Sequence, residues 1–206
     1  MKGNLIIISS PSGGGKGTLI KEVLSSTAGI GYSVSYTTRP MREGEADGRD
    51  YFFVTAGVFE SLIETGEFLE YASVHGNYYG TSRSQVEREI NDGRDVILEI
   101  DVQGALNVMR AAPEAVSIFI LPPSFEVLRE RLTTRATETA ENLSLRLKNS
   151  FGEVALFDRF QYAVINDDRT KATDELRTII LAERLKRDRQ TEAIRVILDS
   201  FDISKL

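Results

Sequence analysis

The chain has 206 residues, of which 41% are hydrophobic and 27% are charged, and its formal net charge is −6. These proportions allow a sizeable buried core, and the acidic balance argues against non-specific binding to nucleic acid or to an anionic membrane. The absence of cysteine excludes disulfides and thiolate metal sites.

The first recognisable stretch predicts a phosphate-binding loop. Residues 5–8 are apolar and mostly β-branched, which indicates a short buried strand, and residues 19–26 carry a helical apolar stripe. Between them lies a glycine-rich segment with one lysine. Glycines let successive backbone N–H groups curl round an anion, and the helix that follows adds its positive end. The segment contains Ser12, Gly13, Gly14, Gly15, Lys16, Gly17 and Thr18.

The segment departs from the usual G-x-x-x-x-G-K-[ST] pattern in two places. Ser10 stands where the first glycine is expected, and Gly17 stands where a Mg²⁺-binding hydroxyl usually lies, with Thr18 one place later. The Gly-Lys-Gly-Thr form resembles the variant found in nucleoside monophosphate kinases. The simpler interpretation is a glycine-rich turn with an incidental lysine.

The remaining pattern predicts alternating strands and helices. Strands are expected at 32–36, 51–54, 68–74, 95–100, 116–121 and 162–165. Helices are expected at 55–65, 82–91, 102–111 and 125–133, then from a break at 134–141 to about 157, and as one or two helices over 171–199. A tight aromatic turn is expected at 76–80. The alternation on both sides of residues 50–81 predicts a parallel α/β core with an insertion.

A second group of polar residues falls within the insertion. Arg39 and Arg42 lie three residues apart in a loop and suit forked hydrogen bonds to a phosphate, with Tyr51 and Tyr79 as neutral donors. Glu70, on a predicted strand, offers the pair of acceptors that the N1–H and N2–H₂ groups of guanine need. The alternative for the arginines is a solvated polar loop.

Several motifs together resemble the guanylate kinase family. They lie at residues 33–44, 50–54, 76–81, 98–105 and 164–168, in the family's order, so the resemblance covers most of the chain. It implies a single domain over 1–206 with a three-layer α/β/α P-loop kinase core and a parallel sheet. Added to the core are a small α+β GMP-binding insertion and a helical lid. The implied core is 1–34, 82–125 and 157–206, the insertion is 35–81, and the lid is 126–156.

The resemblance also implies a role for each matching residue. The GMP site would contain Ser35, Arg39, Arg42, Tyr51, Glu70, Tyr79, Thr81 and Asp101. The ATP site would contain residues 12–18 and Asn166. The catalytic cations would be Lys16, Arg39, Arg42, Arg135 and Arg146. Two alternatives stay open: Asp101 as a helix N-cap, and pairing of Arg135 and Arg146 with Glu130, Glu138 or Glu141, which is favoured for Arg131.

The expected reaction is ATP and GMP giving ADP and GDP, with Mg²⁺ as the cofactor that accompanies ATP and no protein metal ligand. The apolar run at residues 5–8 is too short for a signal peptide, so we expect a soluble cytoplasmic protein without nucleic-acid or membrane partners. A homo-oligomer is left open. Two other functions remain: a kinase for AMP or a pyrimidine nucleotide, and a peptide-binding scaffold module.

Overall fold

The computed structural model describes residues 2–74, 76–134 and 140–201, and its core is a five-stranded parallel sheet with the strand order β2-β7-β1-β8-β9. The central strand β1 is buried throughout. The strands are β1 (Leu5–Ser9), β2 (Ile30–Tyr32), β7 (Asp95–Glu99), β8 (Val116–Leu121) and β9 (Tyr162–Ile165). Near-continuous apolar strands such as β8 are what a sheet covered on both faces requires.

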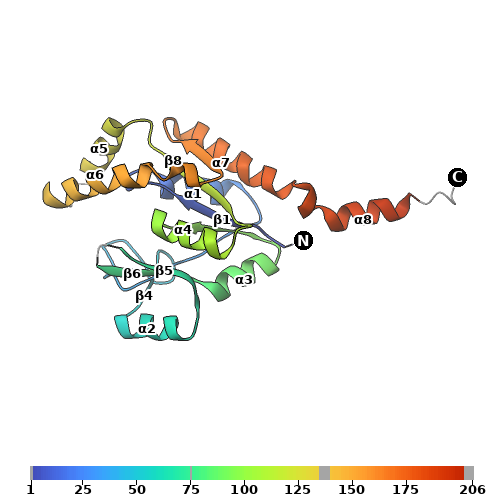
Figure 1. Cartoon of the computed structure of the whole chain (residues 1–206), viewed down its shortest axis with the longest axis horizontal. Coiled ribbons are helices and arrows are strands. Elements are labelled where there is room, and N and C mark those ends of the chain that lie inside the picture. Colours follow the sequence, from blue (N-terminus) through green and yellow to red (C-terminus); the bar gives the residue numbers. More distant parts are fainter. Residues whose placement is uncertain (1, 75, 135–139, 202–206) are drawn as a thin grey trace.

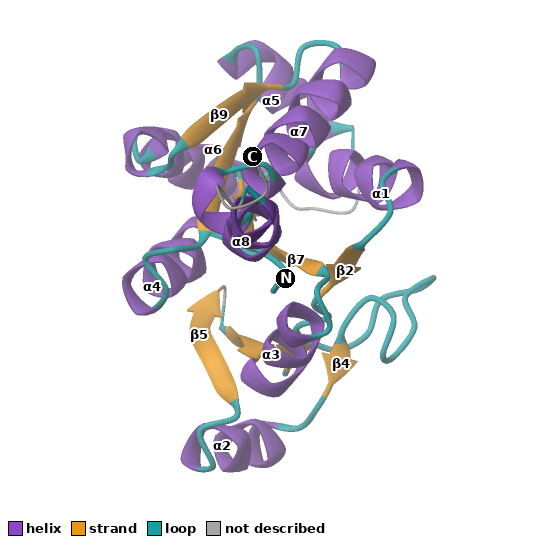
Figure 2. Ribbon diagram, turned by 90° about the vertical axis from the view of Figure 1, so that its right-hand side faces the viewer, coloured by secondary structure: helices purple, strands orange, loops and turns teal. Residues whose placement is uncertain are grey.

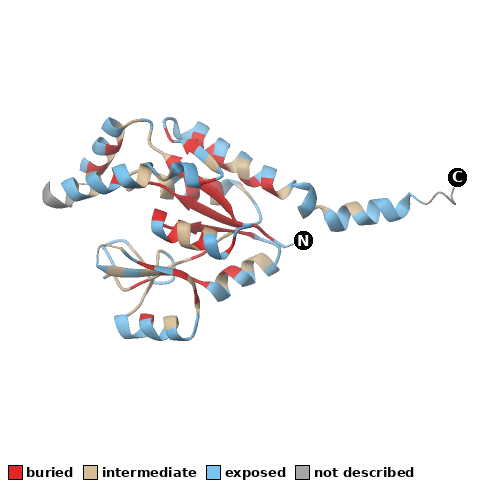
Figure 3. Cartoon of the chain, in the orientation of Figure 1, coloured by how far each residue is buried: buried red, intermediate tan, exposed pale blue. Residues whose placement is uncertain are grey.

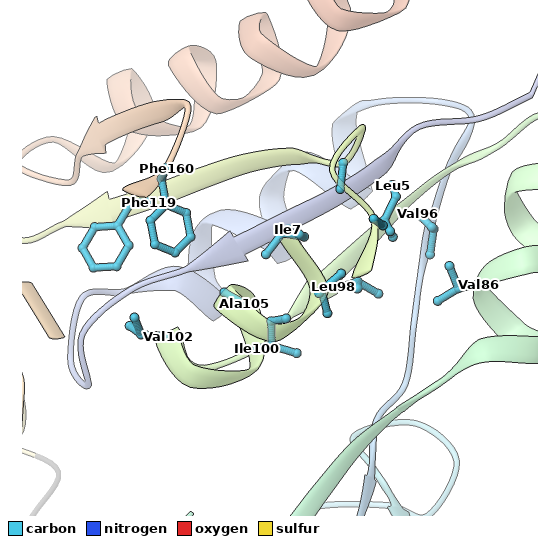
Figure 4. Packing of buried hydrophobic residues seen from close by; sticks show 13 residues of the cluster. Leu5, Ile7, Val86, Val96, Leu98, Ile100, Val102, Ala105, Phe119 and Phe160 are labelled. Atoms are coloured by element: carbon cyan, nitrogen blue, oxygen red, sulfur yellow. The ribbon is translucent and has the colours of Figure 1, made fainter. Parts of the chain in front are cut away.

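Helices cover both faces of this sheet (Figures 1 and 2). Residues of α1 and α7 pack with one set of β1 and β8 side chains, and residues of α4 pack with the alternate set, part of which Figure 4 shows. The three helices are α1 (Lys16–Ser26), α4 (Val102–Ala111) and α7 (Arg169–Arg184). The predicted α/β/α core is therefore confirmed.

The segment between β2 and α3 forms a second, four-stranded sheet with the order β4-β3-β6-β5. Helix α2 packs on this sheet through Phe59, its one buried residue. The centroid of the Phe59 ring lies 4.5 Å from that of Phe68. Gly66, with φ of 70°, follows α2 as the predicted helix stop. The elements are β3 (Tyr36–Thr37), β4 (Phe52–Phe53), α2 (Ala56–Glu64), β5 (Phe68–Val74), β6 (Asn77–Ser82) and α3 (Arg83–Asn91).

Two predictions for this region were wrong. Residues 32–36 are not one strand, because the chain leaves the first sheet after Tyr32 and enters the second at Tyr36. Residues 76–80 are not a tight turn: β6 begins at Asn77 and runs antiparallel to β5. Alternating aromatic side chains suit a strand as well as a turn, and Tyr78 stacks on α2 from this strand.

The remaining helices lie at the two ends of the first sheet. They are α5 (Phe125–Thr133), α6 (Ala140–Val154) and α8 (Thr191–Ser200), with short 3₁₀ turns at Phe157–Arg159 and Arg187–Arg189. Helix α8 extends away from the core and none of its residues is buried (Figures 1 and 3). No helix in the described part of the chain has the length and apolar character needed to cross a membrane.

Candidate active site

The loop between β1 and α1 has the geometry of an anion site. Gly13 and Gly15 adopt φ angles of 86° and 89°, in the left-handed region that favours glycine. Helix α1 begins at Lys16, and its N-cap residue, Gly15, makes no side-chain hydrogen bond to its first turn. The N-terminal N–H groups of a helix have no intrahelical partner and carry the positive end of its dipole. An anion bound in the loop would therefore lie at the positively polarised N-terminus of α1.

Asn166 packs directly against this loop. It follows β9, is buried, and its Nδ2 donates to the Gly14 carbonyl over 2.9 Å. A Cβ on Gly15 would lie 2.2 Å from the same nitrogen, so only glycine fits there. The structure thus gives Asn166 a role in holding the loop, while its predicted contact with ATP stays a prediction.

The Lys16 ammonium is paired with the carboxylate of Glu99, to which no role was assigned from the sequence. Lys16 Nζ lies 3.2 Å from Glu99 Oε1, and the two side chains are 20% and 25% exposed. Glu99 is the last residue of β7, which neighbours β1 and so ends beside the loop. Its sequence signal was a carboxylate at the carboxyl end of a predicted core strand.

Glu99 is surrounded by three further groups of the site. Tyr32 donates its hydroxyl to Oε2 over 3.2 Å, and burial followed by the Glu99 charge raises the pKa of Tyr32 far above its ordinary value. A Cβ on Gly17 would lie 3.2 Å from Oε1. Burial, with a further contribution from Glu99, raises the pKa of Tyr51 to about 12. Both tyrosines therefore stay protonated at neutral pH.

The Arg39 guanidinium is held in place and not solvated. It lies 2.8 Å from Glu45 Oε1, its side chain is 11% exposed, and it lies over the Tyr51 ring at 5.3 Å from the centroid. The Tyr51 and Tyr79 rings meet edge to face at 5.9 Å between centroids. Arg42, by contrast, has an exposed side chain, and its backbone N–H donates to Glu45. The alternative of a solvated loop is wrong for Arg39.

Glu70 is a buried carboxylate facing the start of α4. It lies on β5 opposite Thr81 of β6, and the Thr81 hydroxyl donates to Glu70 Oε1 over 2.9 Å. A Cβ on Gly104 would lie 2.9 Å from Glu70 Oε2 and 3.0 Å from Asp101 Oδ1, so the two carboxylates converge there. Burial, assisted by the Asp101 charge and opposed by the Thr81 hydrogen bond, raises the pKa of Glu70 to about 7.

Asp101 caps α4, and it also joins the two halves of the site. Its side chain accepts from the Gly104 N–H over 2.8 Å, as the N-cap interpretation predicted. Only Ile100 separates Asp101, which faces Glu70, from Glu99, which faces Lys16. The end of β7 and the two residues after it thus carry one carboxylate toward Lys16 of the phosphate loop and another toward Glu70.

Helix α6 also contacts the phosphate loop. Arg146 donates to the Ser12 hydroxyl, with Nε at 3.2 Å, and the Ser12 N–H donates to Glu153 over 3.1 Å. The structure therefore brings Arg146 to the predicted ATP site. Thr18 is an exposed residue of α1, and Ser35 lies just before β3, where its carbonyl accepts from the Phe52 N–H over 2.9 Å.

Helical pairing was the favoured prediction for Arg131, and it was wrong. The Arg131 guanidinium instead donates to the Asn166 carbonyl over 2.9 Å, and its second terminal nitrogen is buried close to Gly15 and has no hydrogen-bond partner among the described residues. Arg131 points inward because it lies on the face of α5 that is turned toward the phosphate loop. A charge pattern along one helix does not show which face will be turned inward. Arg135 and Glu138 lie outside the described residues.

Comparisons with known proteins point to one family. A family model described as guanylate kinase matches residues 2–183. The chain is 52% identical over 199 residues to a guanylate kinase of Neisseria meningitidis serogroup A, covering 97% of both chains. It is 47% identical over 194 residues to one of Thermotoga maritima, covering 94% of both. A crystal structure of guanylate kinase from Anaplasma phagocytophilum superposes with a TM-score of 0.81 at 35% identity, covering 97% of this chain and 95% of the other.

Proposed function

The chain belongs to the guanylate kinase family, and from this premise we propose that it transfers the γ-phosphoryl group of ATP to GMP, giving ADP and GDP, within purine nucleotide metabolism. The observation that carries the proposal is that two carboxylates at the end of β7 face two different groups of the site. There Glu99 pairs with Lys16 of the phosphate loop and Asp101 converges with Glu70. Two nucleotides bound at these two places would have their phosphates between them.

We assign the ATP phosphates to the loop of residues 12–18 and to Lys16, with Arg135 and Arg146 as the cations of the lid. The contact of Arg146 with Ser12 supports this assignment, because it already brings a guanidinium to the loop. Asn166 would line the ATP site, because its side chain is hydrogen-bonded to the Gly14 carbonyl of the loop.

We assign the GMP phosphate to Arg39, Arg42, Tyr51 and Tyr79, and the guanine to Ser35, Glu70, Thr81 and Asp101. The stacking of Arg39 on Tyr51 supports the first group, since it presents a fixed guanidinium beside a protonated phenol. The convergence of Glu70 and Asp101 supports the second, because guanine donates from both N1 and N2.

The proposed mechanism needs no general base. The attacking atom is an oxygen of the GMP phosphate, which is already ionised at neutral pH. The chain would contribute in-line positioning and neutralisation of the charge that spreads over the transferred group. Lys16, the loop N–H groups and the arginines would supply that positive charge.

The residues present fit a Mg²⁺ ion that arrives with ATP. Among the described residues no group of three or more acidic, histidine or cysteine side chains could hold a metal by themselves. Mg²⁺ commonly binds through substrate phosphates, waters and one or two carboxylates. Glu99 is the carboxylate beside the loop and would hold one of those waters. The ion would neutralise charge on the ATP phosphate oxygens.

A coupled assay of ADP release tests the proposed function. GMP should be turned over at least about a hundredfold more efficiently than AMP, UMP or dTMP, because a buried acceptor pair discriminates strongly against a base that cannot donate to it. Preference for another monophosphate would support the rival kinase. A failure to turn over any of the four would support the scaffold interpretation.

The binding of GMP should weaken as the pH falls through neutrality. Burial raises the pKa of Glu70 to about 7, and only its ionised form accepts two hydrogen bonds from guanine. The ionised fraction falls about tenfold between pH 8 and pH 6, so KM for GMP should rise by about that factor. Steady-state kinetics at several pH values checks this. Glu70→Gln should lose this dependence and keep only that of the GMP phosphate, and an unchanged profile in this variant would contradict the prediction.

Three expectations stay predictions: the bounds of the core, insertion and lid, the cytoplasmic location, and the absence of nucleic-acid or membrane partners. Whether the chain forms a homo-oligomer stays open. Helix α8 bears on this question. It exposes Val196, Ile197 and Leu198 by more than half, and no described part of the chain covers them. Light scattering of the purified chain would measure its mass in solution.

A further inference from the structure

Tyr32 holds one oxygen of Glu99, although no sequence motif assigned a role to either side chain. Tyr32 ends β2, which pairs with β7 so that Tyr32 lies opposite Ile97. Glu99 lies two residues beyond Ile97 on the same face of the sheet. The Tyr32 ring packs against the apolar cluster beneath α1. Packing therefore fixes the ring, and the ring fixes the hydroxyl that donates to Glu99 Oε2 over 3.2 Å.

Each of the two Glu99 oxygens has its own donor. Oε2 accepts from Tyr32, and Oε1 pairs with Lys16, both at 3.2 Å. We propose that Tyr32 is a positioning residue that keeps one Glu99 oxygen turned away from Lys16, so that the ammonium group remains available to the ATP phosphates. This inference rests on the proposed function, because it assumes that ATP binds at the phosphate loop.

The physical reason is competition for one cation. A carboxylate that is free to rotate offers both oxygens to a nearby ammonium group, and the resulting pair holds Lys16 more tightly. Before Lys16 can bind a phosphate, that pair must be broken. A hydroxyl on the far oxygen limits the pair to a single contact. Because the Tyr32 hydroxyl is a neutral donor, it restrains the carboxylate without cancelling its charge.

The space around Glu99 makes this restraint specific. A Cβ on Gly17 would lie 3.2 Å from Oε1 and 3.7 Å from Oε2, so the carboxylate already occupies the room that a side chain at position 17 would need. Gly17 therefore leaves Glu99 close to the start of α1. At that distance a small rotation of the carboxylate changes its contact with Lys16.

Removing the Tyr32 hydroxyl should weaken ATP binding and leave GMP binding unchanged. We expect Tyr32→Phe to raise the Kd for ATP, measured by calorimetry without Mg²⁺, by about fivefold. The Kd for GMP should stay within about twofold of the wild-type value. The effect should disappear in a Glu99→Gln background, because the restraint acts only through Glu99.

The chain offers a matched control at the opposite end of β9 from Asn166. Tyr162 of β9 donates its hydroxyl to Glu183 of α7 over 2.5 Å, so Tyr162→Phe also removes a hydroxyl that donates to a carboxylate. It should leave both Kd values unchanged. Melting temperatures of all variants show whether any effect reflects a loss of folding. Such a loss would weaken the binding of ATP and of GMP alike.

Three results would overturn the inference. They are an ATP Kd in Tyr32→Phe within twofold of wild type, an equal loss of ATP and GMP binding, and an undiminished effect in the Glu99→Gln background. The proposed function fails on a different observation, since the wild-type chain would then not phosphorylate GMP in the coupled assay. A wild-type chain that phosphorylates GMP while Tyr32→Phe binds ATP normally would reject the inference alone.

Discussion

Lys16→Ala should lower kcat for ADP release by about 10²–10³-fold at saturating ATP and GMP. Lys16 opens α1 at the mouth of the phosphate loop, and its ammonium is the mobile full charge that can follow the transferred group. Removing one pre-organised group that stabilises transition-state charge typically has an effect of this size. The measurement is the coupled ADP-release assay on purified variants of matched melting temperature.

The folded state should tolerate this change. The pair that Lys16 forms with Glu99 is partly exposed, and such pairs contribute about 0–1 kcal/mol. Glu99 would then be left to accept from Tyr32 and from water. Lys21→Ala is the control, since Lys21 is an exposed lysine on the same helix and should leave kcat unchanged. Wild-type turnover in Lys16→Ala would remove Lys16 from the mechanism and leave the other cations and the loop N–H groups to neutralise the transferred charge.

Much of the core could be predicted because its signals are local. The apolar runs of β1 and β8 and the glycines between β1 and α1 lie within a few residues of one another. The same holds for the start of α3, where Ser82 accepts from the Gln85 N–H over 3.1 Å as a capping box requires. Where neighbouring residues determine the local structure, contacts with the rest of the chain do little to alter it.

The second sheet was harder because its strands are short and its pairing is not local. Tyr36 pairs with Phe52 on one side and with Gly80 on the other, so the chain must bring three distant segments together before β3 exists. Nothing in residues 32–36 marks the point at which the chain changes sheets. The predicted single strand and aromatic turn fail here for that reason.

Glu99 and Arg131 were missed as site residues for a related reason. Glu99 and its partner Lys16 are 83 residues apart, and Arg131 meets Asn166 across 35. The sequence indicates where a strand or helix ends, but it does not indicate which neighbouring element a charged side chain will face. Once β7 is known to lie beside β1, the carboxylate at its end becomes a candidate.

Glu70→Ala should abolish the preference for GMP and leave AMP turnover nearly unchanged. Glu70 is 8% exposed, and the only hydrogen bond that the described residues give its carboxylate comes from Thr81, so its second oxygen is positioned to accept from a bound base. Guanine presents donors at N1 and N2, whereas adenine presents an acceptor at N1 that a carboxylate repels. We expect kcat/KM for GMP to fall about 10²–10³-fold, which is typical when a buried polar partner is lost.

The decisive measurement is the ratio of kcat/KM for GMP to that for AMP, because general damage lowers both values together. Glu60→Ala is the control: Glu60 is an exposed carboxylate on α2 of the same region and should leave the ratio unchanged. Glu70→Gln refines the test, since an amide keeps one acceptor but adds a donor against the guanine N–H groups, and it should lose GMP selectivity as well. A Glu70→Ala variant that kept its full preference for GMP would show that other groups read the base.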